Sequence, residues 1–256
     1  MNINNGTKIN QLLQNWPKGT VATSLWLKEQ GITPILKDKY QESLWIESIG
    51  HGVVIRKGDK VDWPGALFAL QEQLHMEIHV GGKSALELQG YGHFIKFGES
   101  VIHLYVNLDK KLPSWFLNCK WDQSIQLHKT QFLNTTMGII LHQEKNFSIK
   151  ISSPERAFLE ILYLFPKHQD LQECYYILEN MIDLRPSLLQ SLLERVNSVK
   201  VKRLFFFLAD KLNHPWLDQI DKNKIYFGSG KREIIKGGVL DKKYLITVPR
   251  EFVDHD

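Results

Sequence analysis

The chain has 256 residues, of which 43% are apolar and 23% charged, and its formal net charge is +4. This is enough apolar material to bury a real core in one large or two ordinary domains. Cys119 and Cys174 form no pattern of paired cysteines, the start of the chain has no apolar signal core, and no window approaches twenty apolar residues. These features exclude a disulfide framework and a membrane span, and we expect a cytoplasmic protein.

The first part of the chain predicts short helices separated by tight breaks. A helix from Ile9 to Trp16 is stopped by Pro17 and Gly19. A second helix begins near Ala22 and ends at Gly31, since glycine is the residue best able to take the left-handed conformation that ends a helix. Only a tight turn fits before the next element.

Thr33 and Pro34 predict the start of a third helix, because Thr is a favoured N-cap and Pro suits the first helical position. Apolar residues then recur at roughly helical spacing and are expected to face inward: Ile35, Leu36, Tyr40, Leu44 and Trp45. The polar residues between them are expected mostly on the outer face: Lys37, Lys39 and Gln41.

A strand and a basic turn follow the third helix. Gly50 and Gly52 break the helical pattern, residues 53–55 read as a strand, and residues 56–60 form a polar turn that could serve as a wing. This order is the outline of a winged helix-turn-helix, which usually places one helix in a DNA major groove. The same outline also occurs in enzymes and in protein-binding winged helices.

Charge alone does not decide between these alternatives. Residues 1–63 hold eight Lys or Arg and six Asp or Glu, a net charge of only +2. Because phosphate neutralisation drives non-specific DNA affinity, we expect modest, salt-sensitive binding by a monomer. Tight binding would then need a dimer or a second basic surface.

The rest of the chain predicts a mixed α+β region. Residues 63–76 read as a helix, residues 78–80 as a short strand, and residues 83–88 as another helical segment. Gly90 and Gly92 form a natural junction, so we predict a winged helix-turn-helix domain with its following helix at 1–91 and an α+β domain at 92–256.

Short strands and then helices fill the second region. The strand signals are HFIKF, VIHLYVNL, SIQLHKTQFL, GIILHQ and FSIKI, several of them alternating apolar and polar residues. Helices are expected after Ser153–Pro154, over 171–181, after Pro186 and over 199–212, and the tail from Lys224 returns to strands and turns.

Basic residues concentrate late in the chain. Residues 199–250 carry twelve Lys or Arg and five Asp or Glu, a net charge of +7. A basic C-terminal face could therefore contact nucleic acid or an acidic protein, with a solvated lysine-rich surface as the alternative. Its candidate residues are Lys231, Arg232, Lys236, Lys242 and Lys243.

No group of residues indicates an active site, a metal site or a cofactor. His75 and His79 have helical ligand spacing, but Ile78 is expected to begin a strand that turns them apart. The histidines expected on strands could be neighbours in space, although satisfied core or surface histidines explain them as well: His93, His103, His128 and His142. The segment from Gly228 to Lys231 lacks the spacing and following helix of a phosphate loop, so a polar β-turn is favoured.

Four sequence motifs, in order, resemble the AbiEi family of antitoxins and transcriptional regulators of type IV toxin–antitoxin systems. They are NWPKGTVATSLWLKEQGITPILKDKYQESLWIESIGHGVVIRKGD, WPGALFALQEQLHMEIHVGGKSALELQGYGHF, SSPERAFLEIL and GSGKREIIKGGVLDKKYLITVP, which cover most of the chain. The resemblance implies an N-terminal winged helix that binds inverted repeats in its own promoter. It also implies a C-terminal domain that counters a nucleotidyltransferase-like toxin in abortive infection, with or without direct contact.

On this hypothesis the chain is an autorepressor and antitoxin without catalysis, acting as a monomer or DNA-induced dimer. The expected DNA-binding residues are Lys18, Thr33, Lys37, Lys39, Gln41, His51, Arg56 and Lys57. The chain departs from the family at Glu42, Ser43, Leu44 and His51, where more basic residues are common, which lowers the expected DNA affinity. The alternatives are a winged-helix adaptor that binds protein without DNA, and a nucleic-acid enzyme using the strand histidines.

Overall fold

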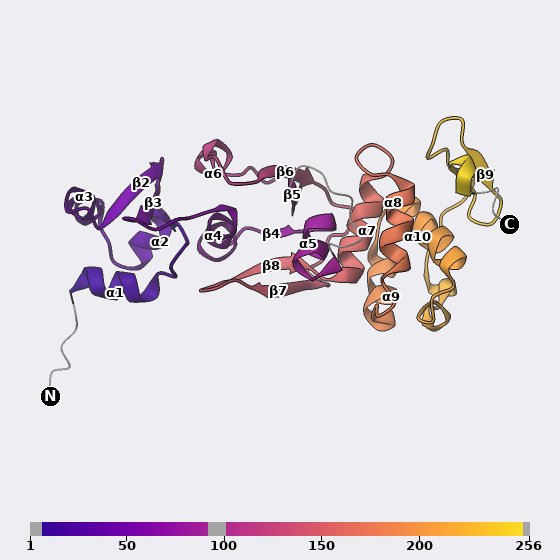
Figure 1. Ribbon diagram of the computed structural model, residues 1–256, viewed down its shortest axis with the longest axis horizontal. Coiled ribbons are helices and arrows are strands. Elements are labelled where there is room, and N and C mark those ends of the chain that lie inside the picture. Colours follow the sequence, from indigo (N-terminus) through magenta and orange to yellow (C-terminus); the bar gives the residue numbers. More distant parts are fainter. Residues whose placement is uncertain (1–6, 92–100, 253–256) are drawn as a thin grey trace. The chain divides into compact units, whose positions relative to one another are not determined.

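The computed structural model describes residues 7–91 and 101–252 and has the expected α+β class (Figure 1). The chain packs into two compact units. Unit 1 comprises residues 1–79, 109–124 and 141–150, and unit 2 comprises residues 80–108, 125–140 and 151–256. This division is not contiguous in sequence, unlike the single boundary expected after residue 91. The predicted strand HFIKF lies outside the described residues.

Unit 1 begins with a winged helix-turn-helix. Its elements are α1 (Lys8–Asn15), β1 (Ala22–Thr23), α2 (Ser24–Glu29), α3 (Pro34–Glu42), β2 (Ile46–Gly50) and β3 (Val53–Arg56). The three strands form an antiparallel sheet in the order β1-β3-β2, with Thr23 opposite Val53 and Ser48 opposite Val54. The three helices and the strand at residues 53–55 occur in the order expected from the sequence, whereas β1 and β2 were not expected.

A small apolar core holds these elements together. Its buried residues are Ile9, Leu12, Trp16, Ala22, Leu27, Ile32, Ile46 and Val54. Leu36 and Tyr40 of α3 pack against this cluster while remaining partly exposed. The helix-turn-helix thus rests on the core through one side of α3, and no residue of α3 is fully buried.

Three residues expected in this core are exposed instead. Ile35, Leu44 and Trp45 expose 72%, 66% and 48% of their surfaces. For Leu44 and Trp45 the expectation was wrong because α3 has only nine residues and ends at Glu42, so its helical phase does not continue to them. Ile35 lies within α3, but the helix contacts the core through Leu36 and Tyr40, which turns Ile35 outward. Leu44 then takes a left-handed backbone conformation with φ of 58°, which redirects the chain into β2.

The wing also differs from its expected position. The tip of the hairpin is His51–Gly52, between β2 and β3, whereas the polar turn at 56–60 follows β3. Lys57 N donates to Trp45 O at 3.0 Å and so closes the base of the hairpin, next to the end of α3. The sequence placed the wing one strand too late because residues 46–50 were not recognised as a strand.

Two buried glutamines fix the rest of unit 1. Helix α4 (Trp63–Phe68) continues into a π-helical turn at Ala69–Gln73, shorter than the helix expected to reach Met76. Gln73 Nε2 donates to Val21 O, and Thr23 N donates to Gln73 Oε1, both at 2.8 Å. Gln71 similarly bonds the backbone of Ile78 and Lys150. Helix α6 (Ser114–Asn118) completes this unit.

A five-stranded sheet has the strand order β6-β5-β4-β8-β7. The strands are β4 (Ile78–Val80), β5 (Val101–Val106), β6 (Ser124–Lys129), β7 (Ile139–Gln143) and β8 (Ser148–Ser152). Strands β4 and β8 are parallel, with Val80 opposite Ile151.

Unit 2 is mainly helical. Its helices are α5 (Gly82–Leu88), α7 (Pro154–Leu164), α8 (Leu171–Glu179), α9 (Pro186–Arg195) and α10 (Val199–Leu212). A two-stranded antiparallel ribbon of β9 (Val239–Asp241) and β10 (Ile246–Val248) follows, after short 3-10 turns at Leu217–Gln219 and Lys222–Lys224 and before one at Arg250–Phe252. In the described ranges 7–91 and 101–252, no helix is long and apolar enough to cross a membrane.

A buried carboxylate organises the core of unit 2. Glu160 on α7 is fully buried and accepts hydrogen bonds from Gly82 N at 3.0 Å and Ser152 Oγ at 2.8 Å. Arg156 Nε donates to the other oxygen of Glu160 at 3.0 Å, while Arg156 also donates to Thr135 O and Met137 O. The Arg156–Glu160 ion pair lies within α7, and its other bonds tie α7 to Gly82, to Ser152 and to the segment from Thr135 to Met137, so the pair is part of the scaffold of unit 2.

Candidate nucleic-acid interface

The helix-turn-helix is defined by two threonine caps and one glycine. Trp26 N donates to Thr23 Oγ1, and Leu36 N donates to Thr33 Oγ1, both at 3.2 Å, so each threonine caps the helix that follows it. Gly31 has a φ of 74° and ends α2 in the left-handed conformation that the sequence predicted. The N-cap at Thr33 and Pro34 at the first helical position are confirmed.

The two sides of α3 differ sharply in composition. Leu36 and Tyr40 face the core. With about 100° between successive helical residues, Ile35, Asp38 and Glu42 lie on the opposite side, and all three are exposed. Lys37 and Lys39 fall on the two flanks of that side, one half-buried and one exposed. The outward side of α3 is therefore acidic and apolar along its centre and basic along its edges.

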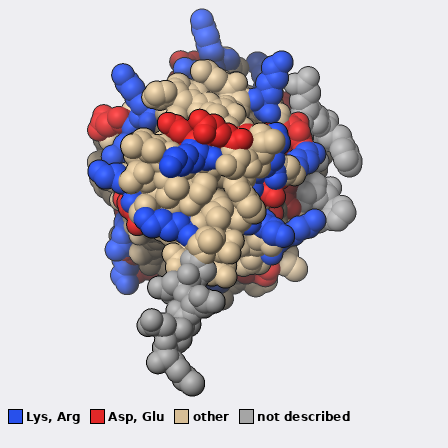
Figure 2. All heavy atoms as spheres, turned by 90° about the vertical axis from the view of Figure 1, so that its left-hand side faces the viewer, with Lys and Arg blue, Asp and Glu red and all other residues tan. Residues whose placement is uncertain are grey.

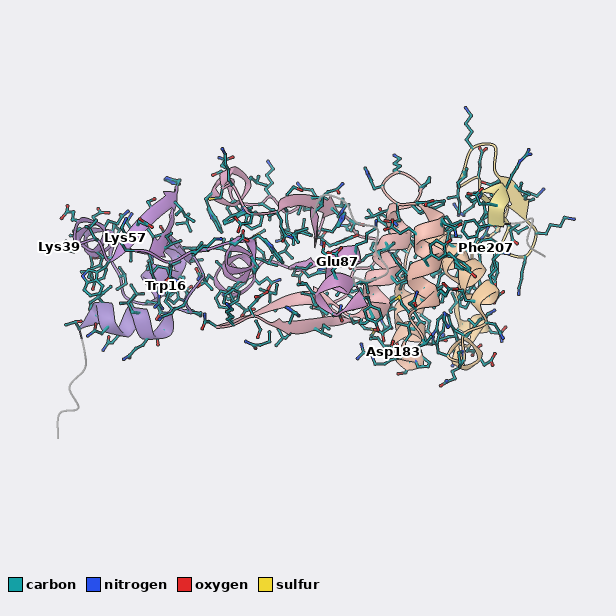
Figure 3. All side chains as sticks on the ribbon, viewed as in Figure 1. Trp16, Lys39, Lys57, Glu87, Asp183 and Phe207 are labelled. Atoms are coloured by element: carbon teal, nitrogen blue, oxygen red, sulfur yellow. The ribbon has the colours of Figure 1, made fainter. Side chains whose placement is uncertain are left out.

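Figure 2 shows the face of the molecule that carries α3. Uncharged atoms cover much of its middle, where an acidic group lies directly beside a basic one. Lys39 and Lys57 are labelled in Figure 3, on α3 and beside the hairpin. Lys57 also forms an ion pair with Glu47, Nζ to Oε2 2.5 Å, which holds it against β2.

The Arg56 side chain is held by contacts within the winged helix and does not extend freely into solvent. One terminal guanidinium nitrogen donates to Leu13 O at 2.7 Å, and the group stacks 5.5 Å from the centre of the Trp16 ring. Burial lowers the pKa of Arg56, an effect that the nearby Asp59 carboxylate opposes. The side chain thus ties the end of β3 to α1 instead of extending from a wing.

The other expected contact residues are spread around the same domain. Lys18 is exposed in the loop between α1 and β1, and His51 is exposed at the hairpin tip. The tip is anchored because Ser24 N donates to Gly52 O at 2.8 Å. Gln41 is half-buried on α3. The sequence analysis did not consider Asp38 and named Glu42 only as a departure from the family; in the structure both are exposed on the outward side of α3.

The C-terminal basic residues lie in unit 2, in the segment before β9 and in the turn between β9 and β10. Lys231, Arg232, Lys236 and Lys242 are exposed. Lys243 forms an ion pair with Asp210, which also binds Lys222 at 3.0 Å, so its charge is partly neutralised. Gly228 and Gly230 have φ values of 67° and 72°, and Arg203 donates to Gly230 O at 2.7 Å. This segment is a turn, as predicted, and no helix begins directly after it. The contact with Arg203 holds the turn against α10.

Two of the strand histidines do meet. His103 Nδ1 and His128 Nε2 are 2.8 Å apart, and the rings stack with centroids separated by 5.1 Å. Burial, together with neighbouring positive groups, lowers the pKa of each ring to about 4. Both rings are therefore neutral near pH 7 and one donates to the other. Within the described parts of the chain, no group of three or more His, Cys, Asp or Glu could hold a metal ion.

Comparison with known proteins gives two matching family models and a related fold. Residues 5–97 match the N-terminal domain of the AbiEi antitoxin transcriptional regulators, and residues 99–249 match the AbiEi antitoxin of type IV toxin–antitoxin systems. The crystal structure of the RV2827C protein from Mycobacterium tuberculosis is similar in fold, with a TM-score of 0.57 and 14% identity over 93% of this chain and 88% of that one. A search of curated proteins finds no match.

The fold is that of a two-part protein, a winged helix-turn-helix followed by an α+β region, and both matching family models describe transcriptional regulators. The two family models together span almost the whole chain, so it belongs to the AbiEi family of antitoxins and transcriptional regulators of type IV toxin–antitoxin systems. This is a family of regulators and antitoxins rather than of enzymes.

Proposed function

We propose that the protein represses its own promoter by binding inverted repeats as double-stranded DNA, and that it counters a nucleotidyltransferase-like toxin without catalysis of its own. The observation that carries this proposal is the position of α3: it is capped, anchored by Leu36 and Tyr40, and exposed to solvent at Ile35, Asp38, Lys39 and Glu42. A helix held in this way can enter a major groove without rearrangement of the domain.

The exposed cations around α3 suit phosphate contacts, which position a protein on duplex DNA. We assign the contacts to Lys18, Thr33, Lys37, Lys39, Gln41, His51 and Lys57. Arg56 is assigned a supporting role, because its guanidinium is bonded to Leu13 O and stacked on Trp16. The ion pair of Lys57 with Glu47 would have to be shared with, or exchanged for, a phosphate.

The low charge of the winged-helix region makes additional contacts necessary for tight binding. Two copies on an inverted repeat would double the net +2 of residues 1–63. The exposed residues of the C-terminal face, Lys231, Arg232, Lys236 and Lys242, offer a second basic surface, with Lys243 weakened by its ion pair to Asp210.

Fluorescence anisotropy with the chain's own promoter fragment tests the DNA role. We expect Lys39→Ala to weaken binding of the full-length protein at every duplex tested, and affinity to fall steeply with ionic strength. Lys28→Ala, an exposed lysine on α2 outside the assigned contacts, serves as the matched control. Equal affinity of Lys39→Ala and wild type would refute the proposal.

A second candidate is a protein-binding adaptor, favoured by four exposed apolar side chains in the winged helix. Leu25, Ile35, Leu44 and Trp45 expose 49%, 72%, 66% and 48% of their surfaces. An apolar protein interface would depend little on salt. A partner retained at high ionic strength and lost on Trp45→Ala, with no promoter binding, would favour the adaptor.

The antitoxin role can be separated from repression in the full-length chain. A Lys37→Ala, Lys39→Ala double variant should lose promoter binding while the fold of unit 2 is unaffected. We expect this variant, expressed from an unrelated promoter, to rescue growth from the co-expressed toxin. Failure to rescue, with the variant folded and abundant, would show that neutralisation depends on DNA binding.

A further inference from the structure

The outward side of α3 carries two carboxylates and one apolar side chain where a DNA-binding helix usually presents cations. Asp38 and Glu42 are four positions apart and Ile35 precedes Asp38 by three, spacings that place all of them on one side of a helix. Ile35 exposes 72% of its surface, and the side chain of Asp38 exposes 63%. None of the three is needed by the core, which α3 contacts through Leu36 and Tyr40.

The two lysines of α3 flank this acidic side. Lys37 and Lys39 are the neighbours of Asp38 in sequence, so their positions on the helix lie about 100° to either side of it. The Lys37 side chain reaches back to form an ion pair with Asp38, Nζ to Oδ1 3.4 Å, which would be exchanged for a phosphate when the helix binds DNA. A helix in the major groove has a phosphate strand on either side and base edges in front. The lysines then face phosphates, and the centre of the helix side, with Asp38 and Glu42, faces the bases. Lys37, one of the DNA-binding residues expected from the sequence, is a phosphate contact in this arrangement.

We propose that Asp38 and Glu42 select cytosines in the operator and that Ile35 contacts a thymine methyl group. This inference rests on the DNA binding proposed above. An ionised carboxylate can only accept hydrogen bonds. In the major groove guanine presents two acceptors, thymine an acceptor, and adenine an acceptor beside its donor, whereas cytosine presents only its N4 amino donor. Cytosine is therefore the base that a carboxylate meets without repulsion.

The geometry of α3 sets the spacing of these bases. Four helical residues advance about 6 Å along the axis, which is about two base-pair steps of roughly 3.4 Å. We expect two selected cytosines about two base pairs apart, with the thymine on the side of the N-terminal end of α3. Ile35 is one helical turn before Asp38, so all three bases fall within one half-site.

The same carboxylates weaken binding to duplexes that lack the selected cytosines. On a duplex without suitably placed amino groups, Asp38 and Glu42 face acceptors and phosphates and gain no hydrogen bond. Specificity of this kind comes from penalising competitors as well as from favouring the operator. It also accounts for a winged helix that is only weakly basic, because non-specific affinity scales with the number of phosphates neutralised.

The test begins with selection of duplexes from a randomised library by the full-length wild-type protein. Affinities are then measured for the selected duplex and for versions in which each cytosine is replaced or the thymine is changed to deoxyuridine. We expect each cytosine replacement to weaken wild-type binding roughly tenfold or more. Asp38→Asn should lose this discrimination at one cytosine and Glu42→Gln at the other, and Ile35→Ala should no longer distinguish thymine from deoxyuridine.

Two control variants make the result specific. Glu29→Gln changes an exposed carboxylate at the end of α2 and should retain every wild-type preference. Lys39→Ala should weaken all duplexes about equally and reduce the salt dependence by about one phosphate contact. Circular dichroism of each variant establishes that it is folded.

The outcomes separate this inference from the proposed function. If the wild type enriches no duplex above non-specific binding, both fail. If it enriches a motif and Asp38→Asn and Glu42→Gln keep all its base preferences, or if Lys39→Ala changes those preferences instead, the carboxylate assignment is overturned and DNA binding stands.

Discussion

The helices α3 and α10 differ in how many of their residues are buried. Helix α10 buries every residue from Val201 to Ala209, including Lys202 and Arg203, whose charged ends bond backbone oxygens of Tyr226 and Phe227. Helix α3 buries no residue and contacts its core through Leu36 and Tyr40 alone. Substitutions in the first kind of helix act on stability, whereas most of those in the second should act on binding. Four predictions of stability test this difference between the two helices and their surroundings, and they follow in order of decreasing expected effect.

Glu160→Gln should produce the largest loss of stability. It removes the negative charge that pairs with buried Arg156, and leaving a buried charge without its partner costs about 3–5 kcal/mol. Urea unfolding measures the loss. Glu42→Gln, the same chemical change on the exposed side of α3, should stay within about 0.5 kcal/mol of wild type. Similar values for the two variants would remove the distinction between these regions.

The His103–His128 pair should make stability depend on pH. Both rings have a pKa of about 4 in the folded chain, against 6.5 for an ordinary histidine. Below pH 6.5 the unfolded chain therefore binds protons that the folded chain does not, so the free energy of unfolding should fall as the pH drops from 6.5 towards 4. A shift of this size corresponds to about 3 kcal/mol for one ring.

The pH effect is checked by urea titrations at several pH values. His128→Phe should reduce the slope of stability against pH in this interval, whatever its effect at pH 7. His51→Phe, at the exposed hairpin tip, provides the matched control and should leave the slope as in wild type. Equal slopes for wild type and His128→Phe would exclude the pair as its cause.

Thr33→Ala should destabilise unit 1 by about 1 kcal/mol. Its hydroxyl accepts the hydrogen bond from Leu36 N that begins α3, and loss of a threonine N-cap typically costs this amount. Thermal unfolding measures it, with Thr33→Ser as the variant that keeps the cap. No difference between the alanine and serine variants would mean that packing alone fixes the start of α3.

Ile35→Ala should have the smallest effect on stability, within about 0.5 kcal/mol, although it removes a large apolar side chain. A buried isoleucine would cost about 2–5 kcal/mol, but Ile35 is 72% exposed. Leu36→Ala, its partly buried neighbour, should cost more. If denaturant unfolding gave the opposite order, the orientation of α3 described here would be incorrect.

The sequence predicted local starts and stops better than orientation. Thr33, Pro34 and Gly31 each act on their own backbone, so their roles followed from residue type alone. The side of α3 that faces the core did not follow from residue type, because a helix of nine residues offers too few positions to fix which side is buried. Leu44 also lies beyond the end of the helix. The position of Arg56 depends on α1, forty residues earlier, and no local pattern reports a contact with Leu13 and Trp16.

The buried side chain of Gln73 has a consequence for how copies of this protein can associate. Strand β1 is an outer strand of its sheet, yet Gln73 occupies the free backbone groups of Val21 and Thr23 as another strand would. An incoming chain finds no open hydrogen-bonding edge there and cannot extend the sheet by strand addition. Copies of the protein therefore cannot associate by strand addition at β1, and this edge is protected from aggregation.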